Sequence, residues 1–218
     1  MDKTNAHQVY KLRSGKVVPG VTTVLNQLGW NKNVLIAWAK KTAMEGKDPD
    51  KVRDKAADIG TIAHAMIDSY LKSETLDLGD YSKNDIEKAT VAFDSFKRWL
   101  DQSNMVYYKS EVQLVNEKYK FGGTIDLITR DKYQEYHLFD FKTSNGIYDE
   151  YIVQVAAYKT LWDMMPDANL IKQCHILKLS KEDGSFNHVE LSDKQMEWGW
   201  KVFTHTLALY KLQKEKNE

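Results

Sequence analysis

The chain has 218 residues, with 31 basic and 31 acidic side chains and therefore no net charge at pH 7. A balanced charge offers no general attraction for a polyanion, so any nucleic-acid surface must be a local patch. The single cysteine, Cys174, excludes a disulfide within the chain and a metal cluster held by several cysteines. The N-terminus is too polar for a signal peptide, and the apolar run VLIAWA is too short to span a membrane. We therefore expect a cytoplasmic protein with one domain over residues 1–218.

The first hundred residues are predicted to be mostly helical. A short hairpin is expected at residues 9–18, and residues 33–46 continue in a helical pattern. Apolar residues then recur at steps of three and four from Pro49 to about Lys72, and again from about Asn84 to Gln102. These two segments predict long amphipathic helices.

The pattern then changes to alternating strands. Three successive strands are predicted at residues 107–115, 120–130 and 135–143, followed by a helix from about Asp149 to Met165. The chain then continues with two more predicted strands, at residues 172–180 and 186–191. It ends with a helix from about Asp193 to Leu212 and the polar tail QKEKNE. This order predicts an α/β fold in which helices cover a mixed central sheet.

The third strand of this series carries two opposite charges in the segment LFDFKT. Because side chains alternate along a strand, Asp140 and Lys142 share one face, while Phe139 and Phe141 share the other. A buried ionised group costs several kcal/mol unless it is paired or binds a metal. This face is therefore either a salt-bridged structural site or a chemical site.

The two preceding strands each contribute one further acid. Asp126 lies within GGTIDLI, where alternation places it on one face with Ile128, while Ile125 and Leu127 occupy the other. Glu111 begins EVQLV in the first strand of the three. The alternative interpretation is that each acid is a solvent-facing charge on a half-exposed sheet. For Glu111, this alternative and a role in the site are equally well supported.

Carboxylates and a lysine on one face suit metal-assisted hydrolysis of a phosphodiester. Magnesium takes oxygen ligands and is commonly bound by one or two carboxylates, as Asp126 and Asp140 would provide. Lys142 could position or deprotonate the attacking water, or stabilise charge that grows on the phosphoryl group. The competing interpretation is that Asp140 and Lys142 form a structural ion pair.

His64 lies on the apolar stripe of the first long helix. A histidine there is often a hydrogen-bonded core residue, but Gly60, one turn earlier, leaves space beside it. Asp68, one turn later, could hold the second imidazole nitrogen and so act as a positioning partner. As a metal ligand, His64 would make manganese as suitable as magnesium.

Four segments in this order resemble the successive motifs of the RecB-like branch of the PD-(D/E)XK nuclease superfamily: GTIAHAMID, GGTIDLI, FDFKTS and QVAAY. The match covers roughly residues 56–159. Upstream, PGVTTVLNQLGW and LIAWAKKTA resemble the N-terminal region of mitochondrial genome maintenance exonuclease and of related phage or bacterial exonucleases.

The resemblance implies a restriction-endonuclease-like core of αβββαβ order and metal-dependent cleavage of DNA. Residues 1–55 would form a helical N-terminal extension, residues 56–190 the core, and residues 191–218 the closing helix and polar tail. The cofactor would be Mg²⁺ or Mn²⁺. Because Cys174 is alone, the four-cysteine iron–sulfur cluster of some RecB-like relatives is not expected.

The resemblance also implies roles for individual residues. The metal ligands would be His64, Asp126, Asp140 and the carbonyl of Phe141. Lys142 matches the catalytic lysine, and Glu111 matches an acid that assists the metal or the water. Gln154 and Tyr158, four residues apart on one helix face, match a motif that supports the site and contacts DNA. From the residues alone, a core-packing role for Tyr158 and a surface amide at Gln154 are an equal alternative. The predicted DNA-binding residues are Thr143, Ser144, Gln154 and Tyr158.

From these features we expect a metal-dependent DNA nuclease, most simply an exonuclease that acts on single strands or ends. A structure-selective endonuclease and an inactive nuclease-like DNA-binding subunit are the alternatives, and the motifs do not distinguish one metal from two. Proteins of recombination or replication are candidate partners. Phosphate contacts are predicted from basic residues of the helical region: Lys40, Lys41, Lys51, Arg53 and Lys55. For each lysine separately, a solvated helix face is an equal alternative.

Overall fold

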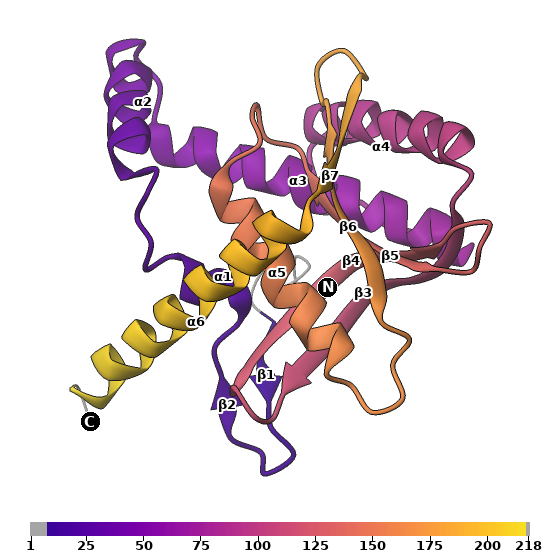
Figure 1. The fold of residues 1–218 in the computed structure, drawn as a ribbon. Coiled ribbons are helices and arrows are strands. Elements are labelled where there is room, and N and C mark those ends of the chain that lie inside the picture. The colour runs from indigo at the N-terminus through magenta and orange to yellow at the C-terminus, as the bar shows by residue number, and fades with distance from the viewer. Residues whose placement is uncertain (1–7, 217–218) are drawn as a thin grey trace.

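The computed structural model describes residues 8–216 and places a five-stranded mixed sheet between two layers of helices (Figure 1). Residues 1–7 and 217–218, and with them the end of the predicted polar tail, lie outside the described residues. The helices are α1 (Val21–Leu25), α2 (Lys32–Met44), α3 (Pro49–Lys72), α4 (Lys83–Ser103), α5 (Asp149–Asp163) and α6 (Asp193–Glu215). The strands are β1 (Tyr10–Lys11), β2 (Val17–Val18), β3 (Val106–Asn116), β4 (Phe121–Arg130), β5 (Tyr136–Lys142), β6 (Ile171–Leu179) and β7 (Phe186–Leu191).

The predicted fold class is confirmed. Strands β3, β4 and β5 form an antiparallel meander, α5 crosses over to β6, which pairs parallel to β5, and β7 closes the sheet antiparallel to β6. A separate hairpin joins β1 to β2, as expected. The closing helix differs from the prediction, because α6 continues to Glu215 and includes the first part of the expected tail.

Local sequence signals explain where the long helices begin. Asp48 caps α3 by accepting hydrogen bonds from the backbone N–H groups of Asp50 and Lys51, and Pro49 occupies the first turn. Ser82 caps α4, and Ser192 forms a capping box with Gln195 at the start of α6. These caps satisfy N–H groups that have no partner within the helix.

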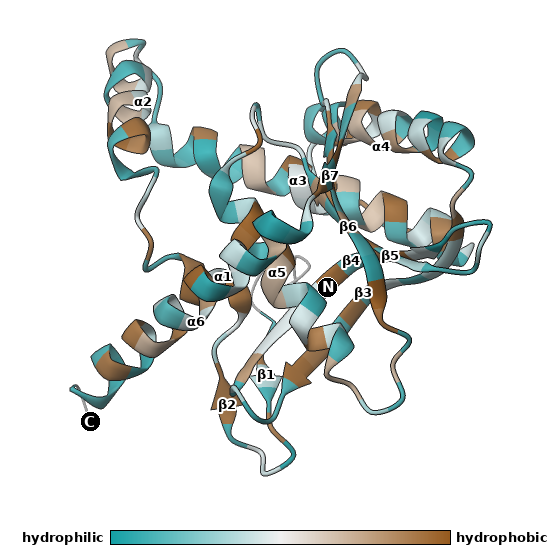
Figure 2. Cartoon of the chain, viewed as in Figure 1, coloured by the Kyte–Doolittle hydropathy of each residue, from teal (hydrophilic) through white to brown (hydrophobic). Residues whose placement is uncertain are grey.

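The sheet has an apolar core on each face. Strand residues such as Leu138 and Ile176 pack with α1, α5 and α6, whereas Phe139 and Leu177 pack with α3 and α4 on the opposite face. Figure 2 shows brown stretches on β3 and β4 and an alternation of teal and brown along the helices. Among residues 8–216, no helix combines the length and apolar character needed to cross a lipid bilayer.

Helix α2 lies apart from these two layers and projects from the end of α3 (Figure 1). Its one buried residue is Thr42, while Val34 and Leu35 are 64% and 60% exposed. A surface helix normally turns such residues towards a core. The apolar surface of α2 is therefore available outside the core of the described chain.

Helices α5 and α6 approach closely at Gly199. A Cβ atom at this position would lie 2.9 Å from the Ile152 carbonyl oxygen and 3.0 Å from the Ala156 Cβ. The corresponding atom at Gly60 of α3 would meet only the Thr143 Oγ1, at 3.2 Å. Both glycines lie within helices, where alanine is favoured by about 1 kcal/mol.

We expect Gly199→Ala to destabilise the protein by about 1 kcal/mol or more, because overpacking of about 1–3 kcal/mol exceeds the gain in helix propensity. Gly60→Ala is the matched control, with the same propensity gain and a contact that a side-chain rotation relieves. Urea unfolding of both variants measures the difference. Equal stability of the two variants would contradict the close approach of α5 and α6.

Candidate active site

The charged pair of β5 lies inside the protein. The Asp140 side chain is 1% exposed, and its Oδ2 lies 2.6 Å from the Lys142 Nζ. Phe139 and Phe141 belong to the core on the opposite face, as strand alternation predicts. The Oδ1 atom of Asp140 is buried and has no hydrogen-bond partner within residues 8–216. One oxygen of this carboxylate is therefore open to a further positive group.

Three other predicted residues converge next to this pair from α3, β3 and β4. The His64 Nδ1 lies 3.5 Å from the Asp126 Oδ1 and 3.9 Å from the Glu111 Oε1. One donor atom from each of the three side chains lies within 4.8 Å of the others, close enough to hold one metal ion. The backbone N–H of Phe141 donates to the Asp126 Oδ2 at 2.6 Å, which ties β4 to β5 at the site.

The backbone is irregular where Glu111 meets Asp126. The pairing of β3 with β4 passes from Ser110–Leu127 to Val112–Ile125, and Glu111 between them has φ +48°. A left-handed backbone is unfavourable for glutamate and is concentrated at functional sites. This irregularity also corrects one prediction: Ile125 packs in the α5 core, not with Leu127 in the α3 core, so alternation breaks at Asp126.

The charges in this cluster shift one another's protonation. Burial alone would lower the pKa of His64, but the Asp126 and Glu111 carboxylates raise it to about 10. Burial acts to raise the pKa of Asp126, but the cations His64 and Lys142 hold it below its usual range. Burial likewise raises the pKa of Glu111. Without a metal, His64 is therefore a cation beside carboxylates.

In the Asp140–Lys142 pair of β5, burial and the neighbouring charges also shift the pKa values in opposite directions. Burial, aided by the charge of Asp126, raises the pKa of Asp140 to about 6 in spite of the nearby Lys142. Burial would lower the pKa of the Lys142 ammonium, yet the carboxylates of Asp140 and Asp126 raise it. A carboxylate that resists ionisation when buried gains from any additional positive charge.

The residues present fit a divalent metal. Oxygen donors suit Mg²⁺ and Mn²⁺, and the imidazole of His64 suits Mn²⁺. The unpartnered Oδ1 of Asp140 and the three convergent donors of His64, Glu111 and Asp126 supply this fit. Asp140 and the Phe141 carbonyl remain predictions as ligands.

The predicted partner of His64 has a different contact. Asp68 forms an ion pair with Lys72, with the Lys72 Nζ 2.8 Å from the Asp68 Oδ1. The ion pairs recorded for His64 are with Glu111 and Asp126. Asp68 instead acts on the site through its charge, which raises the pKa of Glu111. The expected Asp68–His64 contact is therefore corrected, because the lysine one turn later takes the carboxylate.

Gln154 and Tyr158 contact each other inside the protein. The Gln154 Nε2 donates to the Tyr158 hydroxyl at 2.8 Å, and both side chains are buried. The Tyr158 ring packs against Gly123, where a Cβ atom would lie 2.7 Å from the ring. Their predicted direct contact with DNA does not match this burial, because the helix stacks both side chains against the sheet.

The other predicted DNA contacts lie nearer the surface. Thr143 and Ser144 are partly exposed at the end of β5, and the Ser144 Oγ accepts a hydrogen bond from the Tyr151 hydroxyl at 3.0 Å. The Lys142 Nζ lies 4.8 Å from the centre of the Tyr151 ring. Tyr151 was not predicted, because a tyrosine in the first turn of a helix carries no periodic signal.

The basic residues predicted on the helical region are partly neutralised. Arg53 forms ion pairs with Asp50 and Asp54, and Lys55 lies 3.3 Å from Asp85. Exposed ion pairs of this kind contribute little stability, but they reduce the local positive charge. The prediction of phosphate contacts therefore loses support at Arg53 and Lys55.

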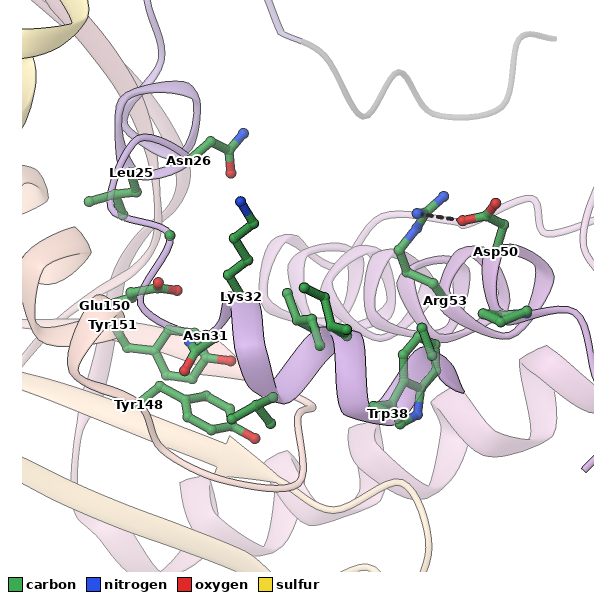
Figure 3. A pocket seen from close by; sticks show the side chains of 16 residues that line it. Leu25, Asn26, Asn31, Lys32, Trp38, Asp50, Arg53, Tyr148, Glu150 and Tyr151 are labelled. Carbon is green, nitrogen blue, oxygen red and sulfur yellow. Dashed lines mark hydrogen bonds and ion pairs between the residues drawn. The ribbon is translucent and has the colours of Figure 1, made fainter. Parts of the chain in front are cut away.

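A groove of about 720 Å³ lies beside the site, between α2, the start of α3 and the segment before α5 (Figure 3). Tyr148 and Tyr151 line one side of it, and Trp38 and Arg53 line the other. Tyr151 thus contacts the catalytic candidates and also borders the groove.

No protein-family model and no curated protein matches this sequence. The fold is similar at low identity to solved structures of exonucleases. A protein described as an exonuclease from Eubacterium rectale is 12% identical to this chain, with a TM-score of 0.46. The match covers 67% of this chain and 64% of the Eubacterium rectale protein. LHK-Exo in complex with dAMP has 14% identity and a TM-score of 0.42 over 74% of this chain and 88% of its own. A second structure, of the alkaline exonuclease LHK-Exo from Laribacter hongkongensis, has 11% identity and a TM-score of 0.35 over 73% of this chain and 86% of its own.

The raised pKa of His64 predicts a pH-dependent stability in the metal-free protein. An unfolded imidazole titrates near about 6.5, so the stabilisation is complete below that pH and is lost as pH rises through about 10. His64→Gln cannot titrate. We therefore expect the wild type's advantage over His64→Gln, measured by urea unfolding in EDTA, to shrink between pH about 7 and about 10.5. A difference that is constant across this range would contradict the imidazolium bridge.

Proposed function

We propose that this protein is a divalent-metal-dependent deoxyribonuclease that acts as an exonuclease on single strands or DNA ends. The observation that carries the proposal is the convergence of five ionisable groups, of which Asp140 is fully buried and the other four are partly exposed. His64, Glu111 and Asp126 present donor atoms to one point, and the buried Asp140–Lys142 pair lies next to them. Three carboxyl groups held this close together, one of them fully buried, are unfavourable for stability alone, which favours a chemical role.

His64, Glu111, Asp126 and Asp140 would hold Mg²⁺ or Mn²⁺, and the Phe141 carbonyl would contribute a further oxygen. When bound, the ion supplies Lewis-acid charge beside the scissile phosphate and makes water a better nucleophile. The Phe141 N–H fixes the orientation of Asp126, and burial keeps bulk water from screening the charge of Asp140. The carboxylates that would bind the ion are therefore held in position before the substrate binds.

Lys142 supplies the positive side. Its ammonium group is held by Asp140 and can orient the attacking water or stabilise the charge that grows on the phosphoryl oxygens. In the reaction, the water oxygen bonds to phosphorus, one phosphorus–oxygen ester bond breaks, and the departing sugar oxygen takes up a proton. The products are a phosphomonoester end and a free hydroxyl.

The groove of Figure 3 supports single strands or frayed ends as substrate. Aromatic side chains stack on unpaired bases, which a duplex keeps stacked inside. Trp38, Tyr148 and Tyr151 line this groove, and Tyr151 reaches Lys142. A strand that passes Tyr151 would bring its phosphate close to the catalytic candidates.

Asp140 and Lys142 should fail in different ways when changed. Asp140→Asn removes a negative ligand, so Mn²⁺ affinity and cleavage should fall together. Lys142→Met removes only the cation, so Mn²⁺ should still bind, while the single-turnover rate falls about a hundredfold or more. Calorimetric Mn²⁺ titration and cleavage of a labelled oligonucleotide measure both effects.

The control is Lys172→Met, the same chemical change in an exposed ion pair with Glu135 at the far end of β6. It should leave the rate unchanged. If Lys142→Met cleaves normally but unfolds at a lower temperature than the wild type, the β5 charges are a structural pair and the proposed chemistry is wrong.

Exonuclease action predicts that ends are required. In Mg²⁺, the wild type should degrade a linear single strand that carries a fluorophore at one end, and should leave the circular form of the same sequence intact. Cleavage of the circle at a comparable rate would establish an endonuclease in place of the proposed exonuclease.

A further inference from the structure

A basic groove of about 670 Å³ lies between the β1–β2 hairpin and the C-terminal half of α6, at the lower side of Figure 1. Its lysines come from three parts of the chain: Lys16 from the hairpin, Lys120 from the turn before β4, and Lys211 and Lys214 from α6. Within the described residues, its one acidic lining residue is Glu215. The groove lies outside the residues assigned to catalysis.

The wider surroundings of this groove are strongly basic. The segments 11–16, 117–120 and 211–216 together contain eight basic residues and two acidic ones: Lys11, Arg13, Lys16, Lys118, Lys120, Lys211, Lys214 and Lys216 against Glu117 and Glu215. The whole chain has 31 of each sign, so the rest of it is net acidic. The fold has therefore gathered positive charge at one place on a protein that is net acidic elsewhere.

The lysines of this groove lack carboxylate partners. Among the ion pairs of residues 8–216, none includes Lys16, Lys120, Lys211 or Lys214. The Lys211 Nζ instead donates to the Tyr119 carbonyl at 2.8 Å. Burial and the like charge of Lys120 lower the pKa of Lys211. A bound anion would relieve this repulsion.

One wall of the groove is connected to the strand that carries the site. Gln8 lines the groove, and its Oε1 accepts a hydrogen bond from the Thr124 Oγ1 at 2.6 Å. Thr124 lies two residues before Asp126 on β4. With a rise of about 3.3 Å per residue, Lys120 lies about 20 Å from Asp126 along the strand.

We propose that this basic groove binds the sugar–phosphate backbone of the DNA strand whose end is being cleaved. Lysines contact phosphates without reading sequence, and Tyr210 in the groove offers a ring for a sugar or a base. A separation of about 20 Å corresponds to about three nucleotides of an extended single strand, whose phosphates lie roughly twice as far apart as the 3.4 Å per strand of a duplex. The inference rests on the nuclease function proposed above and adds a second contact region to it.

The test compares two triple variants that remove the same charge. One is Lys16→Gln, Lys120→Gln and Lys214→Gln, which spares Lys211 because its amino group bonds the backbone. The control is Lys83→Gln, Lys132→Gln and Lys172→Gln, whose lysines lie at the start of α4, after β4 and at the start of β6. The thermal unfolding of both must match the wild type within a few degrees.

The measurement is the binding of a fluorescent single strand of about 20 nucleotides in Ca²⁺ over a range of salt. The groove variant should bind about tenfold or more weakly at low salt, and its salt slope should fall by about 2, since each phosphate contact on a single strand contributes about 0.7. The control variant should retain the wild-type slope. With a strand of about two nucleotides, which is too short to span this separation, the loss in the groove variant should be smaller.

The outcomes separate the two proposals. One outcome is that the wild type binds and cleaves DNA while the groove variant binds with the same affinity and salt slope as the wild type. In that case the groove is not a DNA contact, and the nuclease function stands. If both triple variants weaken binding equally, the effect is general electrostatics and the inference is wrong. If the wild type neither binds nor cleaves with Mg²⁺ or Mn²⁺, the proposed function itself fails, and the inference falls with it.

Discussion

The fold has to keep a cluster of unlike charges inside the protein. Asp140 and Lys142 lie on β5, and Asp126, Glu111 and His64 reach them from β4, β3 and α3. Asp140, at 1% exposure, would not be tolerable as an ion alone, since an unpaired buried charge costs several kcal/mol. Three carboxyl groups and two cations nearly balance, and exchange of the His64 proton for a divalent ion would complete the balance. The sheet order β3–β4–β5 is what brings these groups together.

A second cluster of polar side chains in the interior is stabilised by hydrogen bonds between its rings. Trp99, His188, His175 and His137 form a line of hydrogen bonds, with Nε1–Nδ1 at 3.3 Å and then two Nε2–Nδ1 contacts at 3.0 Å. Because the indole N–H only donates, His188 and His175 each accept at Nδ1 and donate at Nε2, and both are therefore neutral, while His137 accepts at Nδ1 at the end of the line. Burial accordingly lowers the pKa of His175 to about 3. His64 has the opposite shift because carboxylates face it.

Periodicity was sufficient to predict the element order and the shared face of Asp140 and Lys142, since regular strands follow alternation. Periodicity gave wrong contacts where the strand backbone is irregular or where a neighbouring side chain competes for a partner. Glu111 has a left-handed backbone that no sequence pattern announces, and the resulting break changes which neighbours of Asp126 face α5. The Asp68 contact was mispredicted because Lys72 competes for it one turn away. The basic groove joins three segments that only the tertiary fold brings together.

The two glycines at the start of β4 show how the groove and the site are held to one strand. A Cβ atom at Gly122 would overlap the Tyr10 ring, and one at Gly123 would press on the Tyr158 ring. Two adjacent glycines weaken a strand, because they add backbone entropy and provide no side chain to pack. Here their absent side chains allow the hairpin to pack on one side of β4 and α5 on the other. Tyr10 then hydrogen-bonds Thr124, so the hairpin wall of the groove has a fixed position two residues from Asp126.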